Sequence, residues 1–129
     1  MKQTALALLL GVLAAVAASQ ALAGSRIPGQ HVLVTLNADG SGTASGQLGA
    51  IYNGSGTQEY IGCQVSVGGG LYCVARSESG TWAACGGSAY LAKTVNTMSH
   101  DAMVTFSWTS RGQCTLIKVL HSSEFEPKL

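Results

Sequence analysis

Three histidines and six acids are the side chains in this sequence that are best suited to acid–base chemistry. His100 and Asp101 are adjacent, and a serine hydrolase would need such a histidine and acid to meet a serine in space. Adjacent side chains usually point in different directions, and the G-x-S-x-G motif of a nucleophilic serine does not occur. We therefore predict a polar loop at His100 and Asp101 and no catalytic residues. A hydrolase that uses this pair is the unfavoured alternative.

The remaining polar motifs predict neither a metal site nor a cofactor. Zinc sites commonly bring cysteines together as C-x2-C pairs, whereas nine, eleven and twenty-eight residues separate the successive cysteines here. His31 and His121 stand alone at the ends of expected strands and should be exposed. Glu59 and Glu78 fall in expected turns, where solvent surrounds their charge. The triple glycine at 68–70 joins two expected strands and opens no helix, so it is no phosphate loop.

The first part of the chain, residues 1–23, has the pattern of a secretory signal peptide. Lys2 supplies the positive charge, an apolar run covers residues 5–18, and an Ala-Leu-Ala sequence precedes the expected cut. The run is shorter than the ~20 residues of a membrane-spanning helix, so we predict no membrane insertion after cleavage. Residues 24–129 are expected to form a single secreted or periplasmic domain of a bacterium.

Charge and composition narrow the classes of partner. Lys and Arg number 7 against 6 Asp and Glu, and loss of Lys2 with the signal makes the two counts equal. Nucleic-acid binding requires a basic surface that displaces counterions, so we predict no nucleic-acid partner. The chain has 17 glycines and only 10% charged residues. Such a composition buries a small core, which small secreted domains commonly reinforce with disulfides.

Apolar residues recur with a period of two after residue 30, which indicates antiparallel strands joined by tight turns. Strands are expected at 31–37, 43–52, 60–67, 71–76, 81–85, 102–108 and 114–121. The second is the weakest, because glycine lowers strand preference. Asp39-Gly40 predicts a hairpin turn in which both central residues adopt positive φ. The predicted fold is mainly β: a small antiparallel sandwich or twisted sheet with one short helix, stapled by two disulfides.

The segment from Ser88 to Met98 is the one helical candidate. Ser88 stands at the N-cap position, and Leu91, Val95 and Met98 share one helical face. The last strand is apolar on both faces, so its parity does not show which face is buried. The tail at 122–129 is expected to be a surface terminus.

Four cysteines in an exported chain predict two disulfides, and three pairings are open. Three-residue hairpin loops at 67–69 and 78–80 would place Cys63 and Cys85 on either side of Cys73. Cys63 and Cys85 would then lie two strand spacings apart, roughly 9–10 Å, beyond the reach of a disulfide.

That excludes a Cys63–Cys85 bridge and leaves two pairings. Either Cys63–Cys73 occurs with Cys85–Cys114, or Cys73–Cys85 occurs with Cys63–Cys114. We prefer the first, because Cys85 and Cys114 flank one helix and one hairpin and could close that unit.

Tyr60, Tyr72 and Trp82 are the side chains most able to form a binding surface. They share one parity in three consecutive strands, on the face opposite the cysteines. If that face were exposed, it would suit a sugar or a protein partner. We expect instead that these rings form the core of the sandwich and that the cysteine face is outside.

One stretch of the chain, residues 58–128, resembles small secreted bacterial proteins that have four cysteines and no assigned activity. The resemblance is carried by the order Tyr60-Ile61-Gly62-Cys63, Cys73-Val74-Ala75, Cys85, Val104-x-Phe106-x-Trp108, Gly112-x-Cys114 and Pro127-Lys128. It implies an exported four-cysteine domain and no activity, ligand or catalytic residue.

Three functions are compatible with the sequence. The first is a non-catalytic interaction or structural module outside the cytoplasm, with an unidentified protein or glycan as partner. The second is an inhibitor of an extracellular enzyme, for which a rigid disulfide scaffold that presents a loop suffices. The third is the hydrolase, which would gain support from a cleft that joins His100 to a serine and an acid. A structural subunit is a variant of the first, since the apolar strand at 31–37 could be donated to a neighbour's sheet edge.

Overall fold

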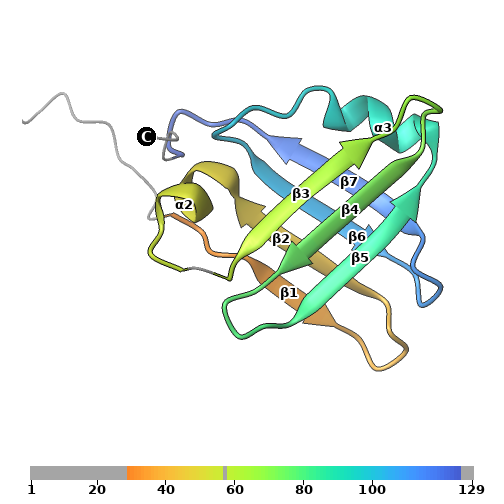
Figure 1. Ribbon diagram of the computed structural model, residues 1–129, viewed down its shortest axis with the longest axis horizontal. Coiled ribbons are helices and arrows are strands. Elements are labelled where there is room, and N and C mark those ends of the chain that lie inside the picture. Colours follow the sequence, from red (N-terminus) through yellow and green to blue (C-terminus); the bar gives the residue numbers. More distant parts are fainter. Residues whose placement is uncertain (1–28, 57, 126–129) are drawn as a thin grey trace, which may run out of the picture.

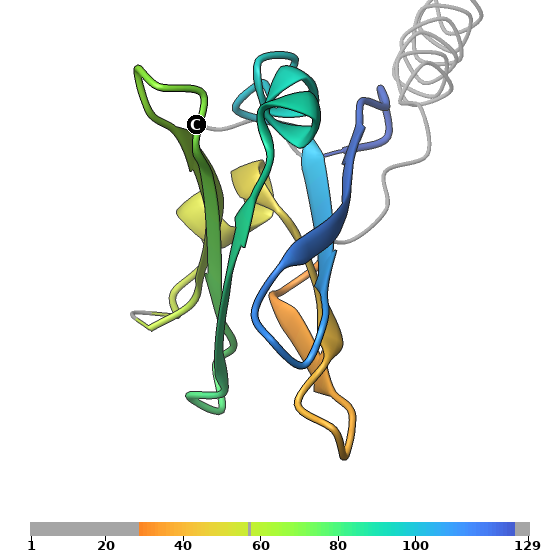
Figure 2. The same cartoon turned by 90° about the vertical axis from the view of Figure 1, so that its right-hand side faces the viewer.

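The computed structural model describes residues 29–56 and 58–125, which form two antiparallel sheets packed face to face (Figures 1 and 2). The four-stranded sheet has the order β1-β2-β6-β7, and the three-stranded sheet has the order β3-β4-β5. The strands are β1 (Leu33–Leu36), β2 (Gly42–Gln47), β3 (Tyr60–Val65), β4 (Leu71–Arg76), β5 (Trp82–Gly87), β6 (Met103–Trp108) and β7 (Cys114–Leu120). The expected mainly β sandwich is confirmed. The expected signal peptide lies outside the described residues.

Two short helices, α2 (Leu48–Asn53) and α3 (Ala89–Val95), accompany the sheets, where one was expected. The segment that forms α2 was expected to continue the second strand, and that prediction is wrong. Leu48 and Ile51 both pack against the core. Their spacing of three puts them on one helical face, whereas a strand would send them to opposite faces.

The second helix agrees with its sequence signals in most respects. Leu91 and Val95 pack against the core, as their helical spacing predicts. The helix ends at Val95 and not at the expected Met98, which packs against the core from beyond it. Ser88 occupies the N-cap position of α3, but its side chain makes no capping hydrogen bond. No helix within residues 29–56 and 58–125 combines the length and hydropathy of a membrane span.

All four hairpins turn in the same way. In each, the carbonyl oxygen of a polar residue accepts a hydrogen bond from the N–H of the third residue after it, and its own N–H donates to the carbonyl oxygen of the fourth. Ser77 bonds Gly80 and Thr81 in this way. The third residue after it is a glycine with positive φ, between 72° and 86°. This includes Gly40, so the first hairpin has a three-residue loop. The prediction that both Asp39 and Gly40 take positive φ is wrong, because Asp39 stays at negative φ.

The core lies between the sheets, and the cysteine face of the three-stranded sheet points into it. Cys73 and Ala75 are fully buried, as is Phe106 from the opposite sheet. The prediction that Tyr60, Tyr72 and Trp82 form this core is therefore wrong. The rings of Phe106 and Trp108, both on β6, fill the middle of the sandwich, which leaves room for only small residues opposite them.

One of the glycines in β2 has a packing role that its low strand preference does not suggest. A Cβ atom on Gly42 would lie 2.6 Å from the indole of Trp108 and 2.3 Å from the carbonyl oxygen of Thr35. Glycine thus leaves room for the buried indole beside β2, and the indole N–H donates to the Gly40 carbonyl oxygen at 3.0 Å.

A bulge in β7 explains why parity did not identify its buried face. Trp108 pairs with Cys114 but Ser107 pairs with Leu116, so Thr115 is an extra residue. Cys114 and Ile117 both point inward as a result, and Leu116 is 48% exposed. The extra residue shifts the alternation by one position, and the sequence carries no sign of it.

Both disulfides follow the preferred pairing, Cys63–Cys73 and Cys85–Cys114. Cys73 lies opposite both Cys63 and Cys85 in the register, as the three-residue loops predicted. The first bridge staples β3 to β4 within one sheet, and the second joins β5 to β7 across the two sheets. A hydrogen bond from the Gly86 N–H to the Gly112 carbonyl oxygen, 3.0 Å, closes the same corner.

The sequence had suggested that the chain beyond β7 lies at the surface, but part of it is buried. Phe125 is only 9% exposed, and its N–H donates to the Ser122 carbonyl oxygen at 3.1 Å. The C-terminal segment therefore adds one ring to the packed part of the molecule.

Candidate functional site

The outer face of the three-stranded sheet presents three rows of side chains, which we call the platform. In the strand register each row takes one residue from each of β3, β4 and β5. The rows are Tyr60–Arg76–Trp82, Gly62–Val74–Ala84 and Gln64–Tyr72–Gly86. The outer rows thus carry the aromatic rings, and the middle row carries small side chains that form a shallow floor between them.

The three rings of the platform are available to a ligand. Tyr60 is 41% exposed, Tyr72 is 47% exposed and Trp82 is 53% exposed. Tyr60 and Trp82 are two strand spacings apart, roughly 10 Å, and Tyr72 lies four residues along the strand from their row, roughly 13 Å. The rings therefore form a triangle around the floor, wide enough for a chain of several small rings to touch all three.

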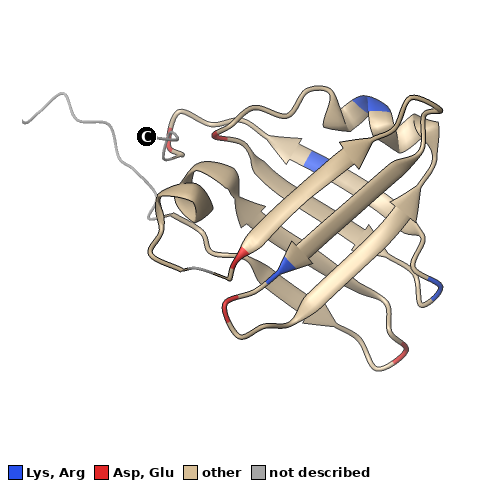
Figure 3. Cartoon of the chain, in the orientation of Figure 1, with Lys and Arg blue, Asp and Glu red and all other residues tan. Residues whose placement is uncertain are grey.

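Charge is almost absent from this face. Arg76 is the only charged residue among the nine platform positions, and its guanidinium donates to the Gln58 side-chain oxygen at 3.0 Å. Figure 3 shows the same sheet in front, with charged residues confined to the ends of its strands. The platform therefore suits an uncharged ligand better than an anionic or cationic one.

An open cleft of about 490 Å³ adjoins the platform at the corner where β5 meets β7. Its lining is Leu71, Gly86, Gly87, Ser88, Gln113 and Cys114. Gly86 belongs to both the cleft and the platform, so the two surfaces are continuous. The polar groups of the cleft are backbone amides, a hydroxyl and a side-chain amide, none of which carries charge.

The pair predicted as a possible catalytic centre is not assembled as such. Asp101 accepts a hydrogen bond from the Ser99 hydroxyl at 2.5 Å, and that hydroxyl lies 3.0 Å from Nδ1 of His121. His100 is exposed and, in the described part of the chain, forms no hydrogen bond with this group. The histidine that contacts a serine bonded to an acid is thus His121, which the sequence had placed alone at a strand end.

This Ser99–Asp101–His121 cluster does not have the order of a catalytic triad. In a triad the histidine stands between the serine and the acid, takes the serine proton and is oriented by the acid. Here Ser99 stands in the middle and donates a hydrogen bond to Asp101, which holds the pKa of Asp101 below its usual value. The other nitrogen of His121 lies 2.9 Å from the Thr97 carbonyl oxygen. The cluster ties the end of β7 to the loop before β6, and it lacks the serine–histidine–acid order of a catalytic triad.

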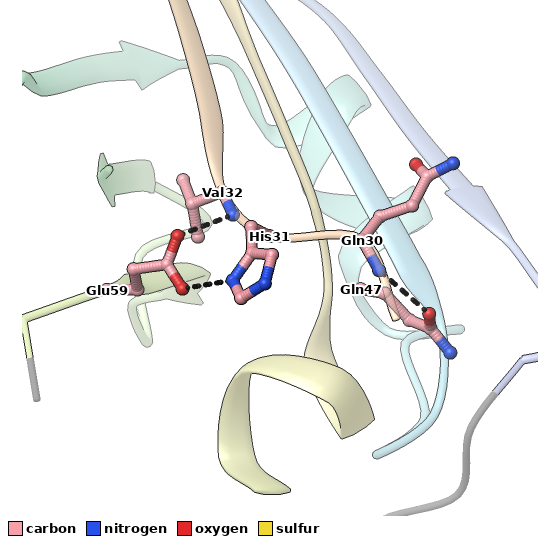
Figure 4. A network of polar contacts seen from close by, with 5 residues as sticks. All are labelled: Gln30, His31, Val32, Gln47 and Glu59. Carbon is pink, nitrogen blue, oxygen red and sulfur yellow. Dashed lines mark hydrogen bonds and ion pairs between the residues drawn. The ribbon is translucent and has the colours of Figure 1, made fainter. Parts of the chain in front are cut away.

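A second polar group joins the beginning of the two sheets, and Figure 4 shows it from close by. One Glu59 oxygen accepts the Val32 N–H at 3.1 Å, and the other lies 2.8 Å from Nδ1 of His31. The hydrogen bond to Glu59 and its negative charge raise the pKa of His31. Only 4% of the Glu59 side chain is exposed, so the prediction that solvent surrounds it is wrong. Next to it, Gln30 and the buried Gln47 bond each other.

The sequence identified the three rings of the platform, but we expected them on the buried face of the sheet and they lie on the exposed one. The signal that could have decided this is Cys114, which lies far along the chain from the three-stranded meander. A bridge from Cys85 to Cys114 requires the cysteine face to point toward the other sheet, and this exposes the opposite face. No family model, curated protein or solved structure matches the chain.

Proposed function

We propose that this protein is a non-catalytic binding module, exported from the cytoplasm, whose platform binds a neutral glycan chain. The observation that carries the proposal is the exposure of Tyr60, Tyr72 and Trp82 around an uncharged floor of small side chains. A sugar ring has apolar C–H faces and a rim of hydroxyl groups. Tyr and Trp match both properties, since each offers a flat apolar face together with an O–H or N–H group.

The size of the platform favours a chain-like ligand over a globular protein. Six residues along three strands cover roughly 20 by 14 Å, or about 300 Å². A standard protein–protein interface buries about 800 Å² on each partner, which is more than twice this area. A single polysaccharide chain needs only a narrow track, and the cleft beside Gly86 would extend that track over the edge of the sheet.

The uncharged lining supports the same class of ligand. Hydroxyl groups of a neutral sugar can bond to Gln64 on the platform and to Ser88 and Gln113 in the cleft without leaving a buried charge unpaired. An acidic polysaccharide would meet only Arg76, and a single exposed charge contributes little to binding.

The experiment is a binding assay on neutral and acidic polysaccharides with matched variants from the two sheets. We expect retention on at least one neutral polysaccharide, and a roughly tenfold loss for Tyr72→Ala or Trp82→Ala, because each ring contributes about 1.4 kcal/mol. Leu33→Ala and Leu116→Ala are the controls, since both residues are exposed on the opposite sheet, at 64% and 48%.

Emission from the exposed Trp82 gives an independent readout, because the other tryptophan, Trp108, is buried at 6% exposure. Ligand that stacks on the platform should shift this emission in the wild type and not in Trp82→Phe. Equal binding by the platform variants and the wild type, or retention only on acidic polysaccharides, would contradict the proposal.

A further inference from the structure

Three side chains that can ligate a metal converge at one edge of the sandwich, away from the platform floor. His31 precedes β1, Glu59 precedes β3, and Glu78 lies in the turn between β4 and β5. One ligand atom from each lies within 4.8 Å of the others. The segments are far apart in the sequence and come from both sheets, so no sequence spacing could have revealed the group.

The central member of this group is held in place by the fold. Glu59 is 4% exposed, and its Oε1 accepts the Val32 N–H at 3.1 Å, which fixes the carboxylate against the start of β1 (Figure 4). Its Oε2 faces His31, whose side chain is 68% exposed. One donor is therefore preorganised, and the exposed His31 and Glu78 can adjust around it.

The two carboxylates of this group have no permanently charged partner in the described part of the chain. Within the described residues no lysine or arginine forms an ion pair with either glutamate, and Arg76, the nearest in sequence, bonds Gln58 instead. Two close carboxylates repel each other, and a divalent cation between them would remove that repulsion.

The donor chemistry identifies the class of cation. One imidazole nitrogen and two carboxylate oxygens are ligands that Zn²⁺ accepts, whereas Ca²⁺ and Mg²⁺ prefer oxygen alone. We propose that His31, Glu59 and Glu78 form a binding site for Zn²⁺, with water as the fourth ligand. The sequence predicted no metal site, because its cysteines do not form C-x2-C pairs and these three donors are far apart along the chain.

The movements that binding requires are small. Ligands about 2.0–2.1 Å from a tetrahedral ion lie about 3.3 Å from one another. His31 and Glu59, whose facing atoms are 2.8 Å apart, must separate by about half an ångström to meet this geometry. Glu78 is exposed in a turn and can approach by rotating its side chain. A bound ion would link β1 of one sheet to β3 and the β4–β5 turn of the other.

The test is a titration of the oxidised, tag-free and metal-free protein with Zn²⁺ at constant pH, followed by calorimetry and thermal unfolding. We expect one Zn²⁺ per chain and a rise in Tm of about 5 °C at ten times Kd. His31→Ala and Glu78→Gln should each weaken binding at least tenfold. His100→Ala and Glu124→Gln are matched controls, since both residues are exposed and lie outside the group.

Each other outcome would overturn the proposal. His31→Ala and Glu78→Gln that fold as the wild type does, by circular dichroism, and bind Zn²⁺ equally well would exclude the site. Loss of binding in His100→Ala would place the ion elsewhere, and tighter binding of Ca²⁺ than of Zn²⁺ would contradict the donor chemistry. None of these results depends on the glycan proposal, because the assay contains no polysaccharide.

Discussion

The two sheets of this sandwich distribute their large and small residues in opposite ways. The four-stranded sheet has an arrangement in which the rings of Phe106 and Trp108 are buried, while Thr43 and Leu116 are exposed. The three-stranded sheet reverses it, with cysteines and alanines inside and Tyr72 and Trp82 outside. The difference shows that one sheet supplies the bulk of the core and the other sheet supplies the exposed rings.

This division has a consequence for stability. Small inward side chains bury little apolar area, so packing alone gives the three-stranded sheet little stabilisation. The two disulfides compensate, since one staples β3 to β4 and the other ties β5 to β7. The platform rings lie outside the core, so the proposed binding role makes no demand on core packing.

Reduction of both disulfides should break this arrangement and have the largest effect on stability. Each bridge contributes about 2–4 kcal/mol, a large share of the ~5–15 kcal/mol of a typical domain. We expect the three-stranded sheet to open first on reduction, and the hairpin of β6 and β7 to keep its protection longer. Hydrogen exchange of the oxidised and reduced protein measures this sheet by sheet. Equal loss of protection in both sheets would mean that the bridges stabilise the domain as a whole.

Two substitutions of an aromatic residue by alanine should show the same contrast between the sheets while both disulfides stay intact. Phe106→Ala removes a fully buried ring and should cost about 3–5 kcal/mol, because a cavity remains in the core. Tyr72→Ala removes a ring that is 47% exposed and should cost less than about 1 kcal/mol. Chemical denaturation under oxidising conditions measures both, with Phe106→Leu as a milder variant if Phe106→Ala does not fold. A large loss in Tyr72→Ala would show that the platform has a structural role.

Local signals in the sequence predicted the connectivity of the three-stranded sheet well. The glycines at 69 and 80 set the loop lengths, and the loop lengths placed Cys73 opposite Cys63 and Cys85. Turn geometry is a property of a few adjacent residues, so it can be read from the sequence. The same reasoning excluded one disulfide pairing, whereas the pairing that occurs was preferred because Cys85 and Cys114 flank one helix and one hairpin.

Features that depend on contacts between distant segments could not be predicted in this way. The burial of Glu59 depends on Val32, which belongs to the other sheet. The contact of Ser99 with His121 depends on how β7 packs beside the loop before β6. Which face of a sheet is buried is also decided by the opposing layer and not by alternation alone. The choice of buried face exposes the platform, and the burial of Glu59 organises the proposed zinc site.

The smallest expected effect concerns the contact between His31 and Glu59, where the two sheets begin. Glu59, and to a lesser degree Glu78, raise the pKa of His31, so the folded state holds the imidazole proton more tightly than the unfolded chain does. The stabilisation is therefore fully present below the unfolded pKa of about 6.5 and is lost as the pH rises through the higher pKa of the folded state.

Its size should be only about half a kcal/mol, because His31 is 68% exposed and solvent screens the interaction. Urea unfolding of the metal-free protein from pH 6 to pH 8.5, with EDTA present, should show this small decline in the free energy of unfolding. The decline should flatten in His31→Ala and persist in His100→Ala, whose imidazole lies outside the group. If His31→Ala keeps the full pH dependence, another group is responsible, and Glu59 then joins the sheets through its bond to the Val32 N–H alone.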